Sequence, residues 1–158
     1  MNKIVYKIIS GGQTGADCGG LDAAIELGLQ HGGFCPKGRR AEDGIIPLIY
    51  NLVETEDTSY PKRTIRNVHS ADATIVISDN GLFDKGTKLT LDLCKNLNFC
   101  KIDLRNKDSA TPKLNEWLRL LSNKLNKEIC INIAGPRESR VPGLQENTKN
   151  FLLDVLKF

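Results

Sequence analysis

Long apolar runs and a strong excess of one charge are both missing from this sequence. No stretch comes near the roughly 18 consecutive apolar residues of a transmembrane helix. The apolar run at residues 4–9 is too short and too broken for a secretory signal. The 22 basic and 19 acidic residues leave a net charge of +3, which is too small to indicate nucleic-acid binding by itself. We therefore expect a cytoplasmic protein with no membrane partner.

Cysteine patterns typical of disulfide frameworks and metal sites are also missing. The five cysteines are an odd number, and no pair has C-x-x-C spacing, which argues against a zinc ribbon or a thioredoxin motif. We expect reduced, mostly buried thiols and no bound metal ion. Cys18 and Cys35 lie in candidate ligand loops, where a thiolate could meet a soft metal. Small, incidental thiols are the favoured interpretation of both.

The length and composition are those of one globular domain. A chain of 158 residues can bury a sizeable core without disulfides, and we expect a single domain over residues 1–158. Apolar residues make up 40% and charged residues 26% of the chain, which excludes disordered and collagen-like classes.

Short apolar segments alternate with helical patterns along the chain. The predicted strands are residues 4–9, 73–78, 99–104 and 129–134, with a short edge strand within 48–53. The predicted helices lie near residues 16–28, 61–70, 89–97 and 144–155, and a further one begins at Thr111-Pro112. This order favours an α/β fold, a single three-layer domain with about five mainly parallel strands and helices on both faces.

Three unusual loops follow predicted strands, at residues 10–17, 78–87 and 135–139. Because ligands of open α/β sheets bind beyond the carboxyl ends of the strands, we expect these loops to converge on one site. The first loop has three glycines in five positions before a helix, which favours an anion held by backbone N–H groups of residues 12–15. It is neither G-x-G-x-x-G nor a P-loop, and a tight turn is the alternative interpretation.

Charged residues near these loops add to the candidate site. Residues 35–44 pack three cations and two anions together, which suits an anionic ligand with hydroxyls or Mg²⁺ but also an ordinary solvated surface. Thr87 either caps a helix or binds phosphate, and Arg137 offers a fork of donors. The candidate ligand-binding residues are Gly11, Gly12, Gln13, Thr14, Gly15, Asp17, Lys37, Arg39, Arg40, Asp43, Arg63, Asn67, Gly86, Thr87, Arg137, Glu138 and Ser139.

Several motifs together resemble the putative molybdenum carrier family. They lie in order along nearly the whole chain, at residues 8–17, 31–44, 63–67, 72–74, 86–90 and 134–139. The resemblance implies a Rossmann-like fold, related to the "lonely guy" phosphoribohydrolases and to DNA-uptake proteins that bind single-stranded DNA. It also implies a small phosphorylated ligand of nucleotide or pterin type, with the molybdenum cofactor (molybdopterin) as the named candidate. A homo-oligomer, dimer or tetramer, is expected from the same resemblance.

One departure from the phosphoribohydrolases bears on catalysis. Those enzymes carry P-G-G-x-G-T-x-x-E, whereas this chain keeps only the Gly-Thr of that motif and has Thr90 in place of the Glu. Because Thr cannot serve as a general acid or base at neutral pH, we favour a binding protein over an enzyme. The alternative is a nucleoside-monophosphate N-glycosidase, with Asp17 or Glu42 as the catalytic carboxylate. A single-stranded DNA-binding module ranks last, since aromatic residues make up only 6% of the chain.

Overall fold

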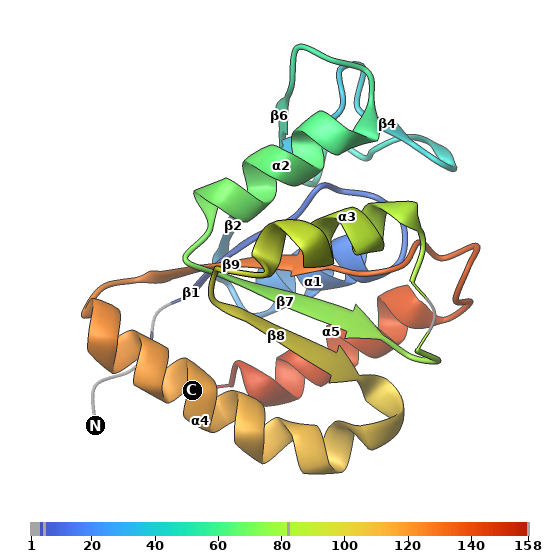
Figure 1. The fold of residues 1–158 in the computed structure, drawn as a ribbon. Coiled ribbons are helices and arrows are strands. Elements are labelled where there is room, and N and C mark those ends of the chain that lie inside the picture. The colour runs from blue at the N-terminus through green and yellow to red at the C-terminus, as the bar shows by residue number, and fades with distance from the viewer. Residues whose placement is uncertain (1–3, 5, 82, 158) are drawn as a thin grey trace.

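Five parallel strands form the central sheet of the computed structural model, which describes residue 4, residues 6–81 and residues 83–157. The strands are β1 (Tyr6–Ile9), β2 (Gln30–Gly32), β7 (Ala73–Ser78), β8 (Phe99–Asp103) and β9 (Ile129–Ala134). Their order across the sheet is β2-β1-β9-β7-β8 (Figure 1). The last strand of the chain thus lies in the middle, pairing with β1 on one side and β7 on the other. The predicted α/β fold is confirmed, and all five strands are parallel.

Mostly apolar runs, rich in β-branched residues, explain strands β7 and β9. All six residues of β7 are buried, and five of the six in β9. Both strands begin and end where the β-branched runs predict. A parallel strand covered on both faces needs such a run instead of strict alternation.

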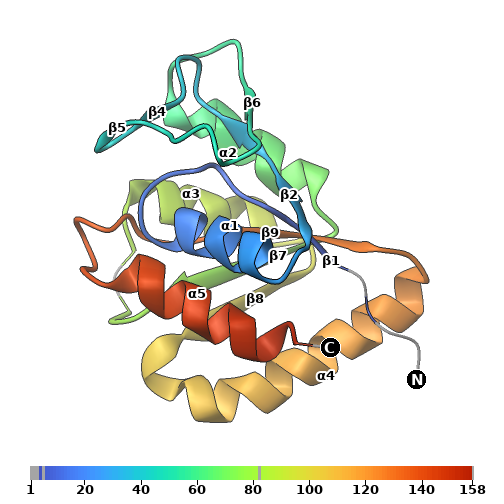
Figure 2. The ribbon, with the colours of Figure 1, turned by 180° about the vertical axis from the view of Figure 1, so that it is seen from behind.

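Helices cover both faces of the sheet, as predicted (Figures 1 and 2). Helices α2 (Tyr60–Ser70) and α3 (Lys85–Cys94) pack together on one face. On the other face, α5 (Leu144–Val155) packs between α1 (Ala16–Glu26) and α4 (Lys107–Leu125). The main core lies between these layers and is dominated by buried Ile and Leu side chains. No helix in the described part of the chain is long and apolar enough to span a membrane.

The start of α4 differs from the prediction. The helix begins at Lys107, directly after a 3-10 turn (η1, Leu104–Asn106), and Pro112 lies inside it. The Thr111 hydroxyl donates a hydrogen bond of 2.8 Å to the Lys107 carbonyl instead of capping a helix start. Pro112 is the sixth residue of the helix, so it costs one hydrogen bond, the one that an N–H there would donate to the Asp108 carbonyl, and the turn before it still forms.

Residues 33–59 form an excursion between β2 and α2. It contains β3 (Phe34–Cys35) paired with β6 (Val53–Glu54), and a hairpin of β4 (Arg40–Ala41) and β5 (Gly44–Ile45). The predicted edge strand within 48–53 is wrong except at its last residue, because the chain turns at residues 47–50.

A second, smaller apolar cluster anchors this excursion. The buried side chains of Cys35, Ile46 and Tyr50 pack against Cys18 and Leu21 of α1. The segment is therefore held on the body of the domain by its own small core.

Candidate ligand-binding site

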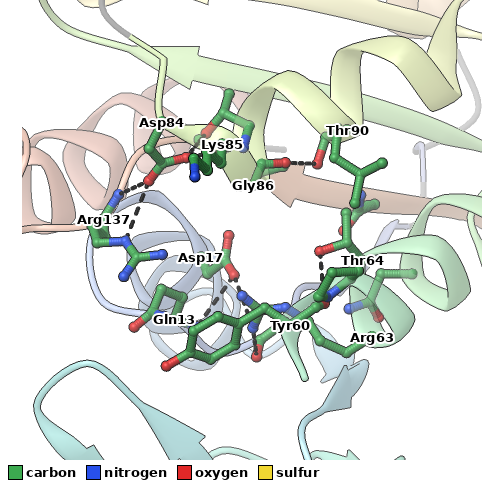
Figure 3. A pocket seen from close by; sticks show the side chains of 18 of the residues that line it. Gln13, Asp17, Tyr60, Arg63, Thr64, Asp84, Lys85, Gly86, Thr90 and Arg137 are labelled. Carbon is green, nitrogen blue, oxygen red and sulfur yellow. Dashed lines mark hydrogen bonds and ion pairs between the residues drawn. The ribbon is translucent and has the colours of Figure 1, made fainter. Parts of the chain in front are cut away.

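A cavity of about 300 Å³ lies beyond the carboxyl ends of β1, β7 and β9. Its walls come from the loop after β1, the first turns of α2, the start of α3 and the end of β9 (Figure 3). From the middle of the sheet, the chain adds β2 outside β1 on one side and β8 outside β7 on the other. The cavity therefore lies at the switch point, where the strand order reverses, and ligands of open α/β sheets usually bind there.

The structure brings about half of the predicted residues to this cavity. Those that line it are Gly11, Gln13, Asp17, Arg63, Asn67, Gly86, Thr87 and Arg137. Those outside its lining are Gly12, Thr14, Gly15, Lys37, Arg39, Arg40, Asp43, Glu138 and Ser139, together with the carboxylate candidate Glu42.

The lining also includes residues that the sequence interpretation missed. They are Tyr60, Pro61, Thr64, Asp84, Lys85, Leu89, Thr90, Asn132, Ile133, Ala134 and Gly135. The helical spacing in the sequence could have indicated two of them. Tyr60 and Thr64 share a helical face with the predicted Arg63 and Asn67, at spacings of three and four residues.

The backbone donors of the glycine-rich loop are largely used within the loop. The N–H of Gly12 donates to Ser10 Oγ at 3.3 Å, and the N–H of Gln13 donates to Asp17 Oδ2 at 3.2 Å. The N–H of Thr14 donates to the side-chain oxygen of Gln13 at 3.1 Å. The geometry therefore does not present these groups as an open anion cradle.

Close packing explains the glycines of that loop instead. A Cβ at Gly15 would lie 2.3 Å from the Pro136 carbonyl oxygen, and its φ of +84° is one that side chains rarely adopt. A Cβ at Gly11 would lie 2.5 Å from Arg63 Nη1. The missing side chains let the loops after β1 and β9 touch and let Arg63 reach the floor of the cavity.

Asp17 and Arg63 form a buried ion pair at this floor. Arg63 Nη1 donates to the Gly11 carbonyl at 2.6 Å and lies 3.8 Å from Asp17 Oδ2. Burial raises the pKa of Asp17 to about 6, although Arg63 and the N–H of Gln13 lower it, and the nearby Asp84 raises it further. The carboxylate is thus incompletely compensated and close to titration at neutral pH.

Asp84 and Arg137 form a second charged pair on the opposite wall. Asp84 Oδ1 accepts hydrogen bonds from the Thr87 N–H at 2.9 Å and from its hydroxyl at 2.8 Å, which caps α3. Asp84 Oδ2 lies 3.4 Å from Arg137 Nε. Burial alone would raise the pKa of Asp84, but the bonds from Thr87 and Arg137 outweigh it and hold the pKa below its usual value. Thr87 is therefore part of a helix cap.

Three arginines surround the ring of one tyrosine in the cavity lining. The guanidinium carbons of Arg40, Arg63 and Arg137 lie 4.8, 5.2 and 5.6 Å from the centre of the Tyr60 ring. Cations at this distance from an aromatic ring are attracted to its π-system. Arg40, although outside the lining, thus adds positive charge to the same opening.

Glu42 joins three loops rather than facing the cavity. Its carboxylate accepts hydrogen bonds from the Thr14 hydroxyl and from the N–H and hydroxyl of Ser139, the last at 2.6 Å. Its own N–H donates to Gln13 at 3.0 Å. Burial would raise the pKa of Glu42, but these bonds from Ser139 and Thr14 hold it below the usual value. The ionised carboxylate thus has hydrogen-bond partners on two other loops and holds the three loops together.

Arg39 holds the excursion in shape. Its guanidinium donates to the carbonyls of Ile46, Pro47, Tyr50 and Leu52, at 2.8 to 3.4 Å. These contacts bend residues 46–52 around one side chain, which is why no strand forms there. The predicted ligand cation is therefore directed to backbone oxygens of its own loop.

Replacement of Arg39 by Ala should loosen this loop. We expect the free energy of unfolding to fall by about 2 kcal/mol, since several carbonyls lose a charged donor. Limited proteolysis within residues 39–53 should become faster. Lys37→Ala, an exposed cation two residues away, is the control and should change neither. Equal protease resistance of Arg39→Ala and the unmodified chain would contradict this role.

Other predicted residues also have structural partners. The Asn67 amide pairs with both the N–H and the carbonyl of Phe34, at 2.8 and 2.9 Å, and so holds β3 on α2. Glu138 accepts the N–H groups of Gly143 and Gln145, at 2.5 and 2.9 Å, at the start of α5.

The thiols in the candidate loops are neutral. Burial, with help from Asp17 and Asp22, raises the pKa of Cys18 to about 12, and burial also raises the pKa of Cys35. Within the described residues, no three His, Cys, Asp or Glu side chains gather as a metal site.

The fold and the cavity define the class of protein, a Rossmann-like domain with a small pocket at the switch point of its sheet. The chain belongs to the circularly permuted YpsA SLOG family, whose sequence model matches residues 8–156. The strand order agrees with this description, because placing β9 and α5 first turns the sheet into the common 3-2-1-4-5 order.

A solved structure extends the relationship. The chain is 36% identical to a putative molybdenum carrier protein from Syntrophus aciditrophicus, with a TM-score of 0.89 over 100% of this chain and 98% of that one. This similarity confirms the resemblance to the molybdenum carrier family. A comparison with curated proteins finds no match.

Proposed function

We propose that the chain binds a small phosphorylated heterocycle in the cavity, with the molybdenum cofactor as the first candidate. The observation that carries the proposal is the convergence of Arg63, Arg137 and Lys85 on one pocket at the switch point of the sheet. Cations and helix starts at such a place are suited to phosphate. The name of the similar solved structure supports the choice of the cofactor.

Phosphate is expected at the rim. Lys85 is exposed, and within the described residues no carboxylate pairs with it, so its charge is available to a ligand. Arg40 is likewise exposed beside Tyr60. The floor instead holds Asp17, which would repel an anion.

Mg²⁺ is a further expectation. Asp84 is the less buried of the two carboxylates in the lining, and Mg²⁺ is commonly held by one or two carboxylates together with phosphate oxygens. We propose that Mg²⁺ enters beside Asp84 and only with the phosphate, because this carboxylate already faces Arg137.

The test is an anoxic calorimetric titration with molybdenum cofactor, with and without Mg²⁺, against AMP as comparator. We expect micromolar or tighter binding of the cofactor. Lys85→Ala should weaken it about fivefold, since one charged contact is worth about 1 kcal/mol. Lys88→Ala, on the same helix but outside the lining, is the matched control and should have no effect. Absence of binding, or equal effects of the two lysines, would contradict the proposal.

The nucleotide N-glycosidase remains the second candidate, and Asp17 is the observation that favours it. A buried carboxylate with a pKa of about 6 in a pocket has the tuning expected of a general acid. Thr90 does not compete for this role, because its hydroxyl donates to the Gly86 carbonyl at 3.1 Å. Binding of AMP without the cofactor, followed by release of free base that Asp17→Asn abolishes, would favour this alternative.

The homo-oligomer stays a prediction. Ile45, Leu48, Ile49 and Val53 of the excursion are 77, 85, 66 and 59% exposed, more apolar exposure than one segment of a monomer usually shows. We propose that this segment lies at an interface between copies, and the molecular mass in solution would test it.

A further inference from the structure

The floor of the cavity holds a buried carboxylate, one oxygen of which faces the opening. Asp17 is 8% exposed, and Figure 3 draws its bonds to Gln13 and Arg63 on one carboxylate oxygen. The other oxygen points into the opening, toward the start of α3 at Gly86 (Figure 3). A buried carboxylate oxygen that faces a cavity is stabilised by any N–H or O–H donor that a ligand brings.

A buried donor without an acceptor lies beside it. The Gln13 side-chain oxygen accepts two backbone N–H groups, from Thr14 and Glu42, so the orientation of its amide is determined. Its nitrogen, Nε2, is buried and has no hydrogen-bond partner within the described residues. Gln13 and Asp17 both line the cavity. A residue with an unpaired donor and a residue with a cavity-facing carboxylate oxygen thus lie side by side in the lining.

The position of Asp17 and Gln13 deep in the cavity determines which part of the ligand reaches them. Arg40 and Lys85 are exposed at the rim, whereas Asp17 and Arg63 are buried. With phosphate at the rim, the innermost part of a nucleotide or pterin phosphate is its ring, not its sugar or side chain. The ring edge therefore meets Asp17 and Gln13.

Resting on the proposed function, we propose that Asp17 is the specificity-determining residue of this pocket. Its cavity-facing oxygen accepts both N–H donors of a 2-amino-4-oxo pyrimidine edge, and Gln13 donates to the adjacent ring carbonyl. This edge is shared by guanine and pterin. Adenine offers a single amino donor beside a ring acceptor, and hypoxanthine lacks the 2-amino group, so each leaves part of the floor unpaired.

The test uses matched pairs that differ by the 2-amino group. GMP is compared with IMP, and 6-hydroxymethylpterin phosphate with its analogue that lacks the 2-amino group, the corresponding 4-oxopteridine phosphate, by calorimetry at pH 7. We expect the 2-amino member of at least one pair to bind about tenfold more tightly, since a charged hydrogen bond is lost otherwise. The two pairs also separate a guanine ligand from a pterin ligand. Asp17→Asn should remove this preference, while Asp43→Asn, outside the lining, should keep it.

The outcomes separate this inference from the proposed function. Equal affinities within both pairs, or a preference that survives in Asp17→Asn, would overturn the role of Asp17. Cofactor binding that is unchanged in Asp17→Asn would do the same while leaving the proposed function standing. Failure of the cofactor and all four phosphates to bind the unmodified chain would instead remove the proposed function and the inference together.

Discussion

Replacement of Gly135 by Ala should destabilise the protein by about 3 kcal/mol or more. Gly135 follows β9 directly and passes against the end of β7. A Cβ there would lie 2.1 Å from the Ile77 carbonyl oxygen and 2.6 Å from the Ala16 Cβ. Neither neighbour can rotate away, because one is the backbone of a central strand and the other begins α1. The methyl group would have to push the end of β9 away from β7 and from the start of α1.

Gly86→Ala provides the control for Gly135→Ala. Gly86 also lines the cavity, but the nearest atom to its added Cβ is Asp84 Oδ1, at 3.7 Å. We expect its free energy of unfolding to stay within about 1 kcal/mol of the unmodified chain, or to rise slightly because Ala favours helix. Urea denaturation measures both variants. Similar stability of the two would mean that the loops around Gly135 are far more adaptable than the packing indicates.

Asp17→Asn should stabilise the protein at pH 8, by about 2 to 3 kcal/mol. The pKa of Asp17 rises on folding from 3.8 to about 6, and two pKa units correspond to about 3 kcal/mol. The causes are burial and Asp84, opposed by Arg63 and the N–H groups of Gln13 and Gly11. An amide has the shape of the carboxylate without its charge, so the variant avoids the cost of burying that charge.

The pH dependence gives the sign of this effect. A group whose pKa is raised by folding favours the folded state when protonated, fully so below pH 3.8, and this contribution disappears as the pH rises through about 6. The two proteins should therefore be equally stable near pH 4 and diverge above it, with the variant more stable. Urea denaturation at pH 4, 6 and 8 measures the difference, and Asp43→Asn should show none. If Asp17→Asn were instead less stable than the unmodified chain at pH 8, the attraction between Asp17 and Arg63 would outweigh the cost of burying the carboxylate.

If Asp17→Asn is more stable and also loses the preference for the 2-amino ring, the role of Asp17 is ligand binding and not stability. A buried, under-compensated charge costs stability, and such costs are typical of functional sites. If Asp17→Asn lost stability together with ligand preference, a structural role of the carboxylate would be the simpler account.

The sequence by itself indicated β1, β7, β8 and β9, the layers and the edge of the sheet where the cavity lies, but it missed β2 and placed an edge strand wrongly within residues 48–53. The runs rich in β-branched residues end where β7 and β9 end, because burial on both faces favours a mostly apolar strand without strict alternation. The loops after β1, β7 and β9 had to meet, because parallel strands place their carboxyl ends at one edge. Gln13, Asp17 and Arg137 were therefore predicted at the cavity from sequence order alone.

Only the tertiary structure decided what each polar group does there. Arg39 and Arg40 are neighbours in the chain, yet Arg39 binds four loop carbonyls and Arg40 reaches Tyr60. Glu42 looked like a catalytic candidate and is engaged by Thr14 and Ser139. Partners such as these lie up to 97 residues away in the chain, beyond any local pattern. A side chain's role follows from which donors and acceptors the fold leaves unpaired, and that is settled only when distant segments have packed together.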